Sequence, residues 1–246
     1  MITAASNSRI KRLVQLNQKS KLRRTEDVFL AEGVKMFLEA PREQLQEVYV
    51  SESFLEKCSC REHLEEVGYE VVSDSVFSKI SDTCTPQGVL CVLKQFHYNI
   101  EEMLRDKAPL FLLLENIQDP GNLGTMLRTG EGAGVSGIIM SRDTVDLYNP
   151  KVIRSTMGSI YRVPFYYADD FAAAVHQVQR AGVSVYAAHL RGKNSYACQD
   201  YTKGTAFLIG NEGNGLREET AELADCYIRI PMEGKVESLN AAVASS

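Results

Sequence analysis

The first part of the chain alternates between short apolar runs and segments with apolar residues at helical spacing. Ile10, Leu13, Val14 and Leu16 recur in the second kind of pattern, which predicts one amphipathic helix over residues 8–24. Downstream, the pattern predicts strands at residues 29–31, 47–50, 69–72 and 88–93, and helices at 33–40, 52–67 and 74–80. Ser73 or Asp74 is expected to cap the last of these helices.

The second part opens with the apolar run LFLLL at residues 110–114, which is typical of a parallel strand buried on both faces. Further strands are expected at 137–140, 183–187, 206–209 and 227–230, and helices at 124–134, 150–159, 169–181, 217–223 and from about Ser238. This alternation predicts an α/β fold with a parallel sheet. Ligands of such sheets bind beyond the carboxyl ends of the strands, so the loops after residues 114, 209 and 230 are the candidates.

The polar segment HYNIEEMLRDKAP separates these two parts. We expect a smaller amino-terminal α/β domain at residues 1–97, a linker at 98–109 and a second domain at 110–246.

The loop after residue 114 reads ENIQDPGNLG and opens a helix. Asn122 lies at the expected helix start, and Arg128 follows almost two turns later, which we expect to place both near one face. An amide and a guanidinium beside one cleft can hold a phosphate or a hydroxyl. A capped strand–helix turn with a surface arginine explains the same residues equally well.

The loop after residue 209, GNEGNGL, has three glycines in six residues, in the order G-x-x-G-x-G. This is not the dinucleotide fingerprint G-x-G-x-x-G, and Glu212 within it would repel a pyrophosphate. The chain also contains no G-x-x-x-x-G-K-[ST] sequence, which argues against ATP hydrolysis. A cationic ligand, or one rich in hydroxyls, suits Glu212 better.

The loop after residue 230 reads PMEGKVESLN and runs into small residues. Ser238 and Asn240 lie near the expected start of a helix, where each can cap the helix or hold a ligand.

Charge is distributed unevenly along the 246 residues, whose formal net charge is −5. The first 24 residues hold no acidic residue and seven basic ones: Arg9, Lys11, Arg12, Lys19, Lys21, Arg23 and Arg24. A basic segment on an acidic body is typical of an arm that contacts phosphates, although a solvated helix face would look the same.

No apolar run is long enough to span a membrane, and the amino terminus lacks a secretory signal, so we expect a cytoplasmic protein with reduced thiols. The six cysteines and four histidines do not show the spacing of a zinc site, and no metal is expected.

Taken together, the three loops resemble the motifs of the SpoU (TrmH-type) branch of the SPOUT RNA methyltransferases. The matching segments are LFLLLENIQDPGNLGTMLRTGEGAG, FLIGNEGNGL and IRIPMEGKVESLNAAVA, with NPKVIRSTMGSI resembling the family's middle helix. SNSRIKRLVQLNQKSKLRRTEDVFLAEGVKMFLEA and KISDTCTPQGVLCVL resemble its amino-terminal substrate-binding domain, which is similar to a small ribosomal RNA-binding protein. The resemblance covers nearly the whole chain.

The resemblance implies a carboxyl-terminal SPOUT domain with a trefoil knot, which general topology rules would not suggest. It also implies methyl transfer from S-adenosylmethionine to a ribose 2′-oxygen of structured RNA by a homodimer that associates through this domain. The implied donor-binding residues are Gly210, Ile230, Met232 and Leu239, and the implied catalytic positions are Arg128, Asn122, Glu212, Ser238 and Asn240. For RNA binding we single out Arg9, Lys11, Arg12, Arg23 and Arg24.

Several alternatives remain open at this stage. Ribosomal RNA is favoured over transfer RNA by the two-domain plan, and a member that binds RNA without methylating it is the second candidate. A Rossmann-type oxidoreductase is disfavoured by the missing fingerprint. Members of the family continue their last helix further than the six residues that follow Asn240, so a truncated carboxyl end is also an expectation.

Overall fold

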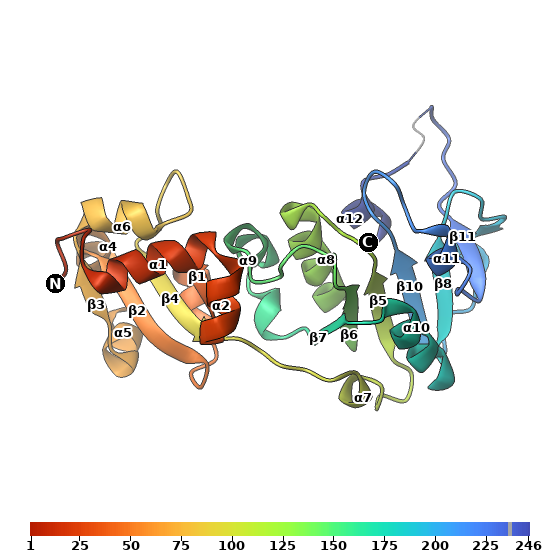
Figure 1. The fold of residues 1–246 in the computed structure, drawn as a ribbon, viewed down its shortest axis with the longest axis horizontal. Coiled ribbons are helices and arrows are strands. Elements are labelled where there is room, and N and C mark those ends of the chain that lie inside the picture. The colour runs from red at the N-terminus through yellow and green to blue at the C-terminus, as the bar shows by residue number, and fades with distance from the viewer. Residues whose placement is uncertain (236–237) are drawn as a thin grey trace. The chain divides into compact units, whose positions relative to one another are not determined.

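A computed structural model describes residues 1–235 and 238–246 of the chain. The chain forms two compact units (Figure 1). Unit 1 consists of residues 1–96 and 146–161, and unit 2 consists of residues 97–145 and 162–246. The chain therefore passes between the units three times.

Unit 1 contains a four-stranded sheet with the order β1-β4-β2-β3. Its strands are β1 (Val28–Glu32), β2 (Leu45–Ser51), β3 (Glu70–Val72) and β4 (Val89–Lys94). β4 is antiparallel to both β1 and β2, whereas β2 and β3 are parallel. The helices are α1 (Ser8–Gln18), α2 (Ser20–Glu26), α3 (Val34–Leu38), α4 (Glu52–Lys57), α5 (Arg61–Val67), α6 (Asp74–Ile80) and α9 (Pro150–Thr156), with a 3-10 turn η1 (Ser159–Tyr161).

The predicted helix over residues 8–24 is two helices, because Lys19 has an extended backbone between them. The apolar side of α1 is nevertheless as predicted: Ile10, Leu13 and Leu16 are buried in a core with residues of α6 and the sheet. Ser73 occupies the amino-terminal cap position of α6, one of the two expected, but its side chain makes no capping hydrogen bond.

Residues 146–161 complete the core of unit 1. The Tyr148 ring lies 4.8 Å from the Phe29 ring, and the Tyr148 hydroxyl donates to the carbonyl of Phe96 at 3.1 Å. The buried hydroxyl of Tyr161 donates to the carbonyl of Met36 at 2.9 Å. This segment, which the sequence suggested belongs to the second domain, packs with the first.

Unit 2 contains a seven-stranded sheet with the order β7-β6-β5-β10-β8-β11-β9, and every pairing is parallel. Its strands are β5 (Leu110–Leu114), β6 (Gly137–Ser141), β7 (Phe165–Ala168), β8 (Ser184–Ala188), β9 (Asn194–Ser195), β10 (Thr205–Ile209) and β11 (Cys226–Arg229). Its helices are α7 (Ile100–Met103), α8 (Pro120–Ala133), α10 (Phe171–Arg180), α11 (Glu218–Ala221) and α12 (Ala241–Ala244), with a 3-10 turn η2 (Tyr196–Cys198). The α/β class and the parallel sheet are confirmed, while β7 and β9 were not predicted.

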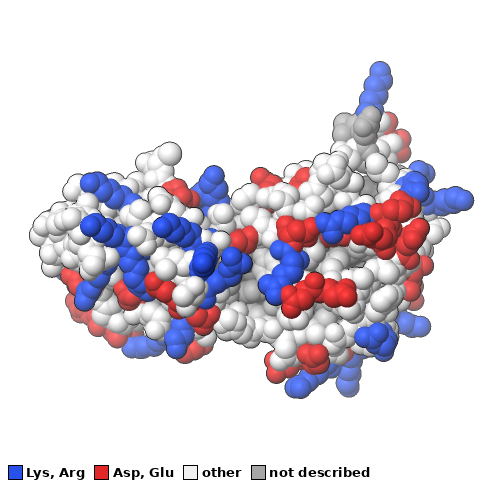
Figure 2. Space-filling view, in the orientation of Figure 1, with Lys and Arg blue, Asp and Glu red and all other residues white. Residues whose placement is uncertain are grey.

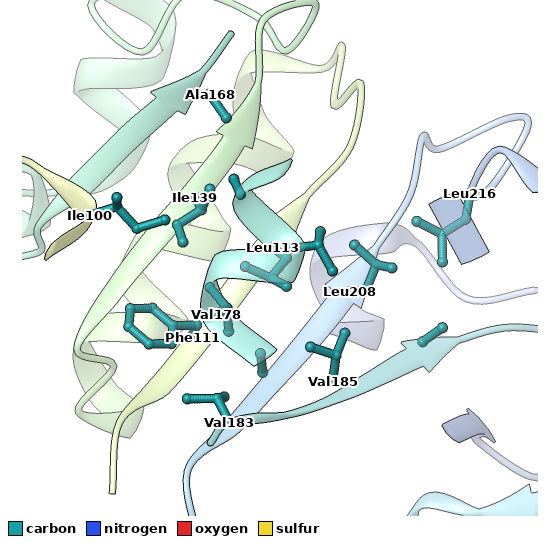
Figure 3. Packing of buried hydrophobic residues seen from close by; sticks show 14 of the residues in the cluster. Ile100, Phe111, Leu113, Ile139, Ala168, Val178, Val183, Val185, Leu208 and Leu216 are labelled. Carbon is teal, nitrogen blue, oxygen red and sulfur yellow. The ribbon is translucent and has the colours of Figure 1, made fainter. Parts of the chain in front are cut away.

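The β5 run is apolar throughout because the sheet is covered on both faces. Phe111 and Leu113 pack with Leu208, Val185 and Val178 of neighbouring strands and α10 (Figure 3). Leu112 and Leu114 alternate with them, point to the other face, and are also buried. In the described parts of the chain, no helix is both long and apolar enough to cross a membrane.

Candidate active site

The candidate site starts where two neighbouring strands of unit 2 end. β5 and β10 are paired in register, with Leu114 opposite Ile209. The loops that follow them therefore begin side by side, as expected for the carboxyl edge of a parallel sheet. The first loop leads into α8, whose amino terminus is capped by the Asp119 side chain and begins with Pro120.

The carboxylate of Glu212 joins these two loops. Its Oε1 accepts hydrogen bonds from the backbone nitrogen of Asp119 at 3.0 Å and from Nδ2 of Asn122 at 3.1 Å. Its Oε2 accepts from the backbone nitrogen of Gln118 at 3.1 Å and from Nδ2 of Asn211 at 3.4 Å. Both oxygens are thus occupied by groups of the protein.

These hydrogen bonds also set the ionisation of Glu212. Partial burial alone would raise the pKa of this carboxyl, but the donors from Asp119, Asn122 and Gln118 stabilise the charged form. The net result is a pKa below its ordinary value of 4.5, so Glu212 is an anion at neutral pH.

Asn122 links Glu212 to the last helix. While its amide nitrogen donates to Glu212, its Oδ1 accepts from Nδ2 of Asn240 at 3.0 Å. The Oδ1 of Asn240 in turn caps α12 by accepting from the backbone nitrogens of Ala242 and Val243. Residues from three distant parts of the sequence therefore form one polar chain, as the loop positions had led us to expect.

An open pocket lies beside these hydrogen-bonded side chains of Glu212, Asn122 and Asn240. It is lined by Gln118, Asp119, Pro120, Asn122, Asn211, Glu212, Gly213 and Asn240. Most of its lining residues have polar side chains, and the ionised Glu212 gives it a negative charge.

The glycine loop folds back on itself beside Glu212. Asn211 and Gly215 exchange two backbone hydrogen bonds, and Asn211 Oδ1 accepts from the backbone nitrogens of Gly213 and Asn214. A Cβ at Gly210 would lie 2.2 Å from the backbone of Gly215. A side chain at Gly210 would thus collide with the backbone of the loop itself, so the fold of the loop alone requires glycine at this position.

Arg128 is exposed on α8, and it does not belong to the described residues that line the pocket. Six residues of helix rotate a side chain by about 240°, so Asn122 and Arg128 are about 120° apart and do not share a face. The expectation of a common face rested on counting turns and is wrong. The catalytic assignment of Arg128 stays a prediction.

The loop after β11 presents several of the remaining predicted residues. Met232, Ser238 and Leu239 are exposed, and Ile230 is half-buried. None of the four lies among the residues lining the pocket, and their predicted roles stay predictions.

Lys and Arg side chains gather over α1 and α2 in unit 1 (Figure 2). Arg9, Lys11 and Arg24 are exposed, although Arg9 also pairs with Glu70. Arg12 is half-buried between two carboxylates, those of Glu26 and Glu47. These four remain candidates for RNA contact, with Arg12 already neutralised within the protein.

Arg23 requires a correction, because only 3% of its side chain is exposed. Its Nη1 donates to the carbonyls of Leu16 and Asn17, and its Nη2 pairs with Asp146 at 2.5 Å. Arg23 therefore holds α1, α2 and residue 146 together and cannot present its charge to an RNA phosphate.

The loop after β8 was not among the loops predicted to meet at this edge of the sheet. Because β8 lies between β10 and β11, this loop begins between two of the expected ligand-binding loops. Its Leu190 is 70% exposed, and a Cβ at Gly192 would lie 2.8 Å from the backbone of Ile228 in β11. Strand order decides this placement, and the apolar patterns do not reveal strand order.

The pocket at the carboxyl edge of the parallel sheet in unit 2 and the basic helical face of unit 1 define a class, the two-domain α/β proteins. Comparison with known sequences narrows this class. The sequence model of the SpoU rRNA Methylase family matches residues 109–246, and that of the MRM3-like substrate binding domain matches residues 7–91. The chain belongs to the SpoU rRNA methylase family.

Individual relatives agree with this assignment. The 23S rRNA (guanosine(2553)-2′-O)-methyltransferase RlmP of Bacillus subtilis is 32% identical over 100% of this chain and 96% of its own length. The crystal structure of an AdoMet-bound rRNA methyltransferase from Sinorhizobium meliloti is 30% identical, with a TM-score of 0.84, and covers 99% of this chain and 93% of that one. A solved structure that concerns "the 2-OH methylation of C/U34 on tRNA" is 32% identical, with a TM-score of 0.52. The match covers 56% of this chain and 90% of that one.

Proposed function

We propose that this chain transfers a methyl group from S-adenosylmethionine to a ribose 2′-hydroxyl of ribosomal RNA. The observation that carries the proposal is the similarity to RlmP, which extends through both units. The tRNA-related structure, by contrast, covers little more than half of the chain. A substrate-binding domain shared with rRNA enzymes favours ribosomal RNA as the substrate class.

The residues at the site fit the proposed donor. S-adenosylmethionine supplies a methyl group on a positively charged sulfur that is already a good leaving group. The ionised Glu212 gives the pocket a negative charge, and Met232 and Leu239 offer exposed apolar surface in the loop after β11. We expect Gly210 and Ile230 to contribute backbone contacts, as the resemblance implies.

The difficult step is activation of a weakly acidic hydroxyl. Arginine is a poor general base because its pKa lies above about 12. We therefore assign Arg128 to stabilise the developing negative charge on the 2′-oxygen and to pin a neighbouring phosphate. Asn122, Glu212 and Asn240 shape the pocket, and the resemblance assigns Ser238 to the same catalytic set.

RNA binding is assigned to the exposed basic residues of unit 1. Lys19 and Lys21, which are also exposed, extend the set formed by Arg9, Lys11 and Arg24. Their charges are sequence-independent anchors, which position an RNA without reading its bases.

A member that binds RNA but does not methylate it is the competing function. The presence of Asn122, Arg128, Glu212, Ser238 and Asn240 together disfavours it, because loss of activity removes the constraint on these positions. A transfer-RNA substrate is the third candidate.

Three further properties belong to the proposal. We infer a trefoil knot in unit 2, a homodimer formed through its carboxyl-terminal part, and action in the cytoplasm, where ribosomal RNA is modified. The exposed Val243 on α12, 58% accessible, supports an interface at this helix.

The test is methyl transfer from labelled S-adenosylmethionine by the purified chain. The substrates are ribosomal RNA from cells lacking this protein and, as the alternative, total transfer RNA from the same cells. Label in ribosomal RNA at a ribose 2′-oxygen supports the proposal, and label only in transfer RNA replaces it. Calorimetry with S-adenosylmethionine, with a nicotinamide cofactor as control, separates the classes: a methyltransferase binds the former and an oxidoreductase the latter.

A further inference from the structure

Glu115, the first residue after β5, is a buried carboxylate outside the pocket, with only 1% of the residue exposed. Its Oε1 accepts from the hydroxyl of Thr220 at 2.5 Å, and its Oε2 accepts from the backbone nitrogen of Arg217 at 2.8 Å. The Arg217 guanidinium lies 3.5 Å from the same carboxylate. A carboxylate this deeply buried requires such partners, because burial without them is costly.

Arg217 and Thr220 belong to the start of α11, directly after the glycine loop. Arg217 is the amino-terminal cap residue of α11, yet its own side chain makes no capping hydrogen bond. Glu115 supplies an acceptor at this end of the helix from a distant part of the sequence. It thereby fixes the point where the glycine loop ends.

Each of the two loops contributes one carboxylate that accepts backbone hydrogen bonds from the other loop or from the residue directly after it. Glu115, from the loop after β5, accepts from the backbone of Arg217. Glu212, from the loop after β10, accepts from the backbone of Gln118 and Asp119. We call this arrangement the reciprocal clamp.

We propose that Glu115, together with Thr220, is a positioning residue for the methyl-transfer site. Among the described residues, its hydrogen bonds go to none of the groups that line the pocket, but it fixes the far end of the loop that carries Glu212. The near end is fixed by the β5–β10 ladder, in which the backbone nitrogen of Glu115 itself donates to the carbonyl of Ile209. With both ends held, Glu212 meets the donors from Gln118, Asp119 and Asn122.

The expected loss of methyl-transfer rate rests on the proposed function, whereas the expected change in amide exchange does not. If the far end of the glycine loop moves, Glu212 loses alignment with its donors. Small errors of position cost much of the rate in a reaction that depends on geometry. Contact with RNA through unit 1 does not depend on this loop.

The experiment compares full-length Thr220→Val, Thr220→Ser and Thr205→Val variants with the wild type. Valine keeps the shape of Thr220 and removes its hydroxyl, whereas serine restores it. Thr205 is a matched control because it is buried at the amino end of β10, where its hydroxyl donates to the carbonyl of Lys203 at 2.9 Å. The readouts are single-turnover methyl transfer at saturating donor and RNA, KM for RNA, and hydrogen exchange of the Gln118 and Asp119 amides.

For Thr220→Val we expect about a ten-fold slower transfer, the scale of one hydrogen bond to a charged group, with KM for RNA unchanged. The Gln118 and Asp119 amides should exchange faster in this variant and at the wild-type rate in Thr220→Ser and Thr205→Val. Wild-type exchange at both amides in Thr220→Val, or an equal loss of rate in Thr205→Val, would overturn the proposal. Absence of transfer by the wild type would count against the proposed function alone, since the exchange measurement requires no activity.

Discussion

Arg23 and Arg24 are neighbours with the same charge, but they lie in different environments. Arg24 is exposed at the end of α2, whereas Arg23 is buried against carbonyls of α1 and the carboxylate of Asp146. A buried guanidinium with several partners stabilises the fold, whereas an exposed one is available for an RNA phosphate.

We therefore expect opposite outcomes from the two alanine variants. Arg23→Ala should lower the free energy of unfolding by about 2–3 kcal/mol, since it leaves buried acceptors without a donor. Arg24→Ala should leave stability unchanged, weaken RNA binding and flatten the log–log salt dependence by roughly 0.7–0.9 for one lost phosphate contact. Urea unfolding and RNA titration at several salt concentrations measure both, and equal salt slopes for Arg24→Ala and the wild type would contradict the RNA assignment.

Arg128 differs from both because its expected role is kinetic. Arg128→Ala should reduce single-turnover methyl transfer by ~100-fold or more, the scale of losing one oxyanion donor. Affinity for S-adenosylmethionine should barely change, and Arg128→Lys should recover part of the rate because it keeps the charge but not the planar fork. Arg180→Ala, a change of another exposed arginine in unit 2, is the control. Normal turnover by Arg128→Ala with RNA saturating would show that Arg128 serves binding only.

Ionisation of Glu212 makes the stability of the folded protein depend on pH. Its pKa is lower in the folded protein than its ordinary value, so its contribution to stability is fully present above pH 4.5 and is lost as pH falls through the lowered value. Glu212→Gln cannot titrate at this position. Its stability should change less than that of the wild type on acidification below pH 4.5, which thermal unfolding across this range measures. Parallel pH profiles would mean that the folded protein does not favour the ionised form of Glu212.

At the scale of elements, the glycine loop is shaped by contacts within itself. Gly210 faces the backbone of Gly215 at a distance that excludes any side chain, whereas a Cβ at Gly213 would lie 3.6 Å from Asn211 Oδ1, an ordinary contact. These two glycines look alike in the sequence but have different tolerance for substitution.

We predict that Gly210→Ala destabilises the protein by about 1–3 kcal/mol through overpacking and weakens donor binding, because the loop must rearrange. Gly213→Ala is the matched control for stability and should leave the free energy of unfolding unchanged, because a Cβ there makes only an ordinary contact. Chemical unfolding and calorimetry with S-adenosylmethionine test the pair. Tolerance of Gly210→Ala in both measurements would show that the loop adjusts at no cost.

The elements that the sequence predicted well are those whose pattern is local. The LFLLL run gives β5 with the correct bounds, and the spacing in residues 74–80 gives α6. β7 was missed because Phe165–Ala168 is short and has no clear period. The break at Lys19 was missed because residues 8–24 contain no Gly or Pro that would mark it.

The position of the site could be predicted from the sequence, whereas its buried pairings could not. Polar residues after β5 and β10 meet because parallel strands end at one edge, a rule that the sequence pattern can invoke. The burial of Arg23 depends on Asp146, which is 123 residues away, and the buried pairing of Glu115 with Thr220 spans 105 residues. Such pairings depend on tertiary packing, and no local pattern encodes them.

At the scale of the whole molecule, the carboxyl-terminal helix carries the proposed dimer. Val243 is mostly exposed on α12, and a charge there should oppose burial in an interface. We expect full-length Val243→Glu to sediment as a monomer at micromolar concentrations at which the wild type is a dimer. A monomeric wild type would contradict dimerisation itself, and a dimeric variant would move the interface elsewhere.

The full chain is the proper subject for this measurement because of residues 146–161. These residues pack with residues 1–96, so a fragment that begins after the amino-terminal part would expose Tyr148 and Tyr161, which are buried in the full chain. Aggregation of such a fragment could be mistaken for specific association.

Because residues 146–161 return to unit 1 after residues 97–145 of unit 2, unit 1 cannot be completed early in protein synthesis. The last residue that unit 1 requires is Tyr161, although most of the unit ends at Phe96. At ~5–20 residues per second, a ribosome takes roughly 3–13 s to add the intervening chain. During that interval Phe29 and Arg23 lack the partners that bury them, so the amino-terminal unit completes its folding only after much of the methylase sequence has been made.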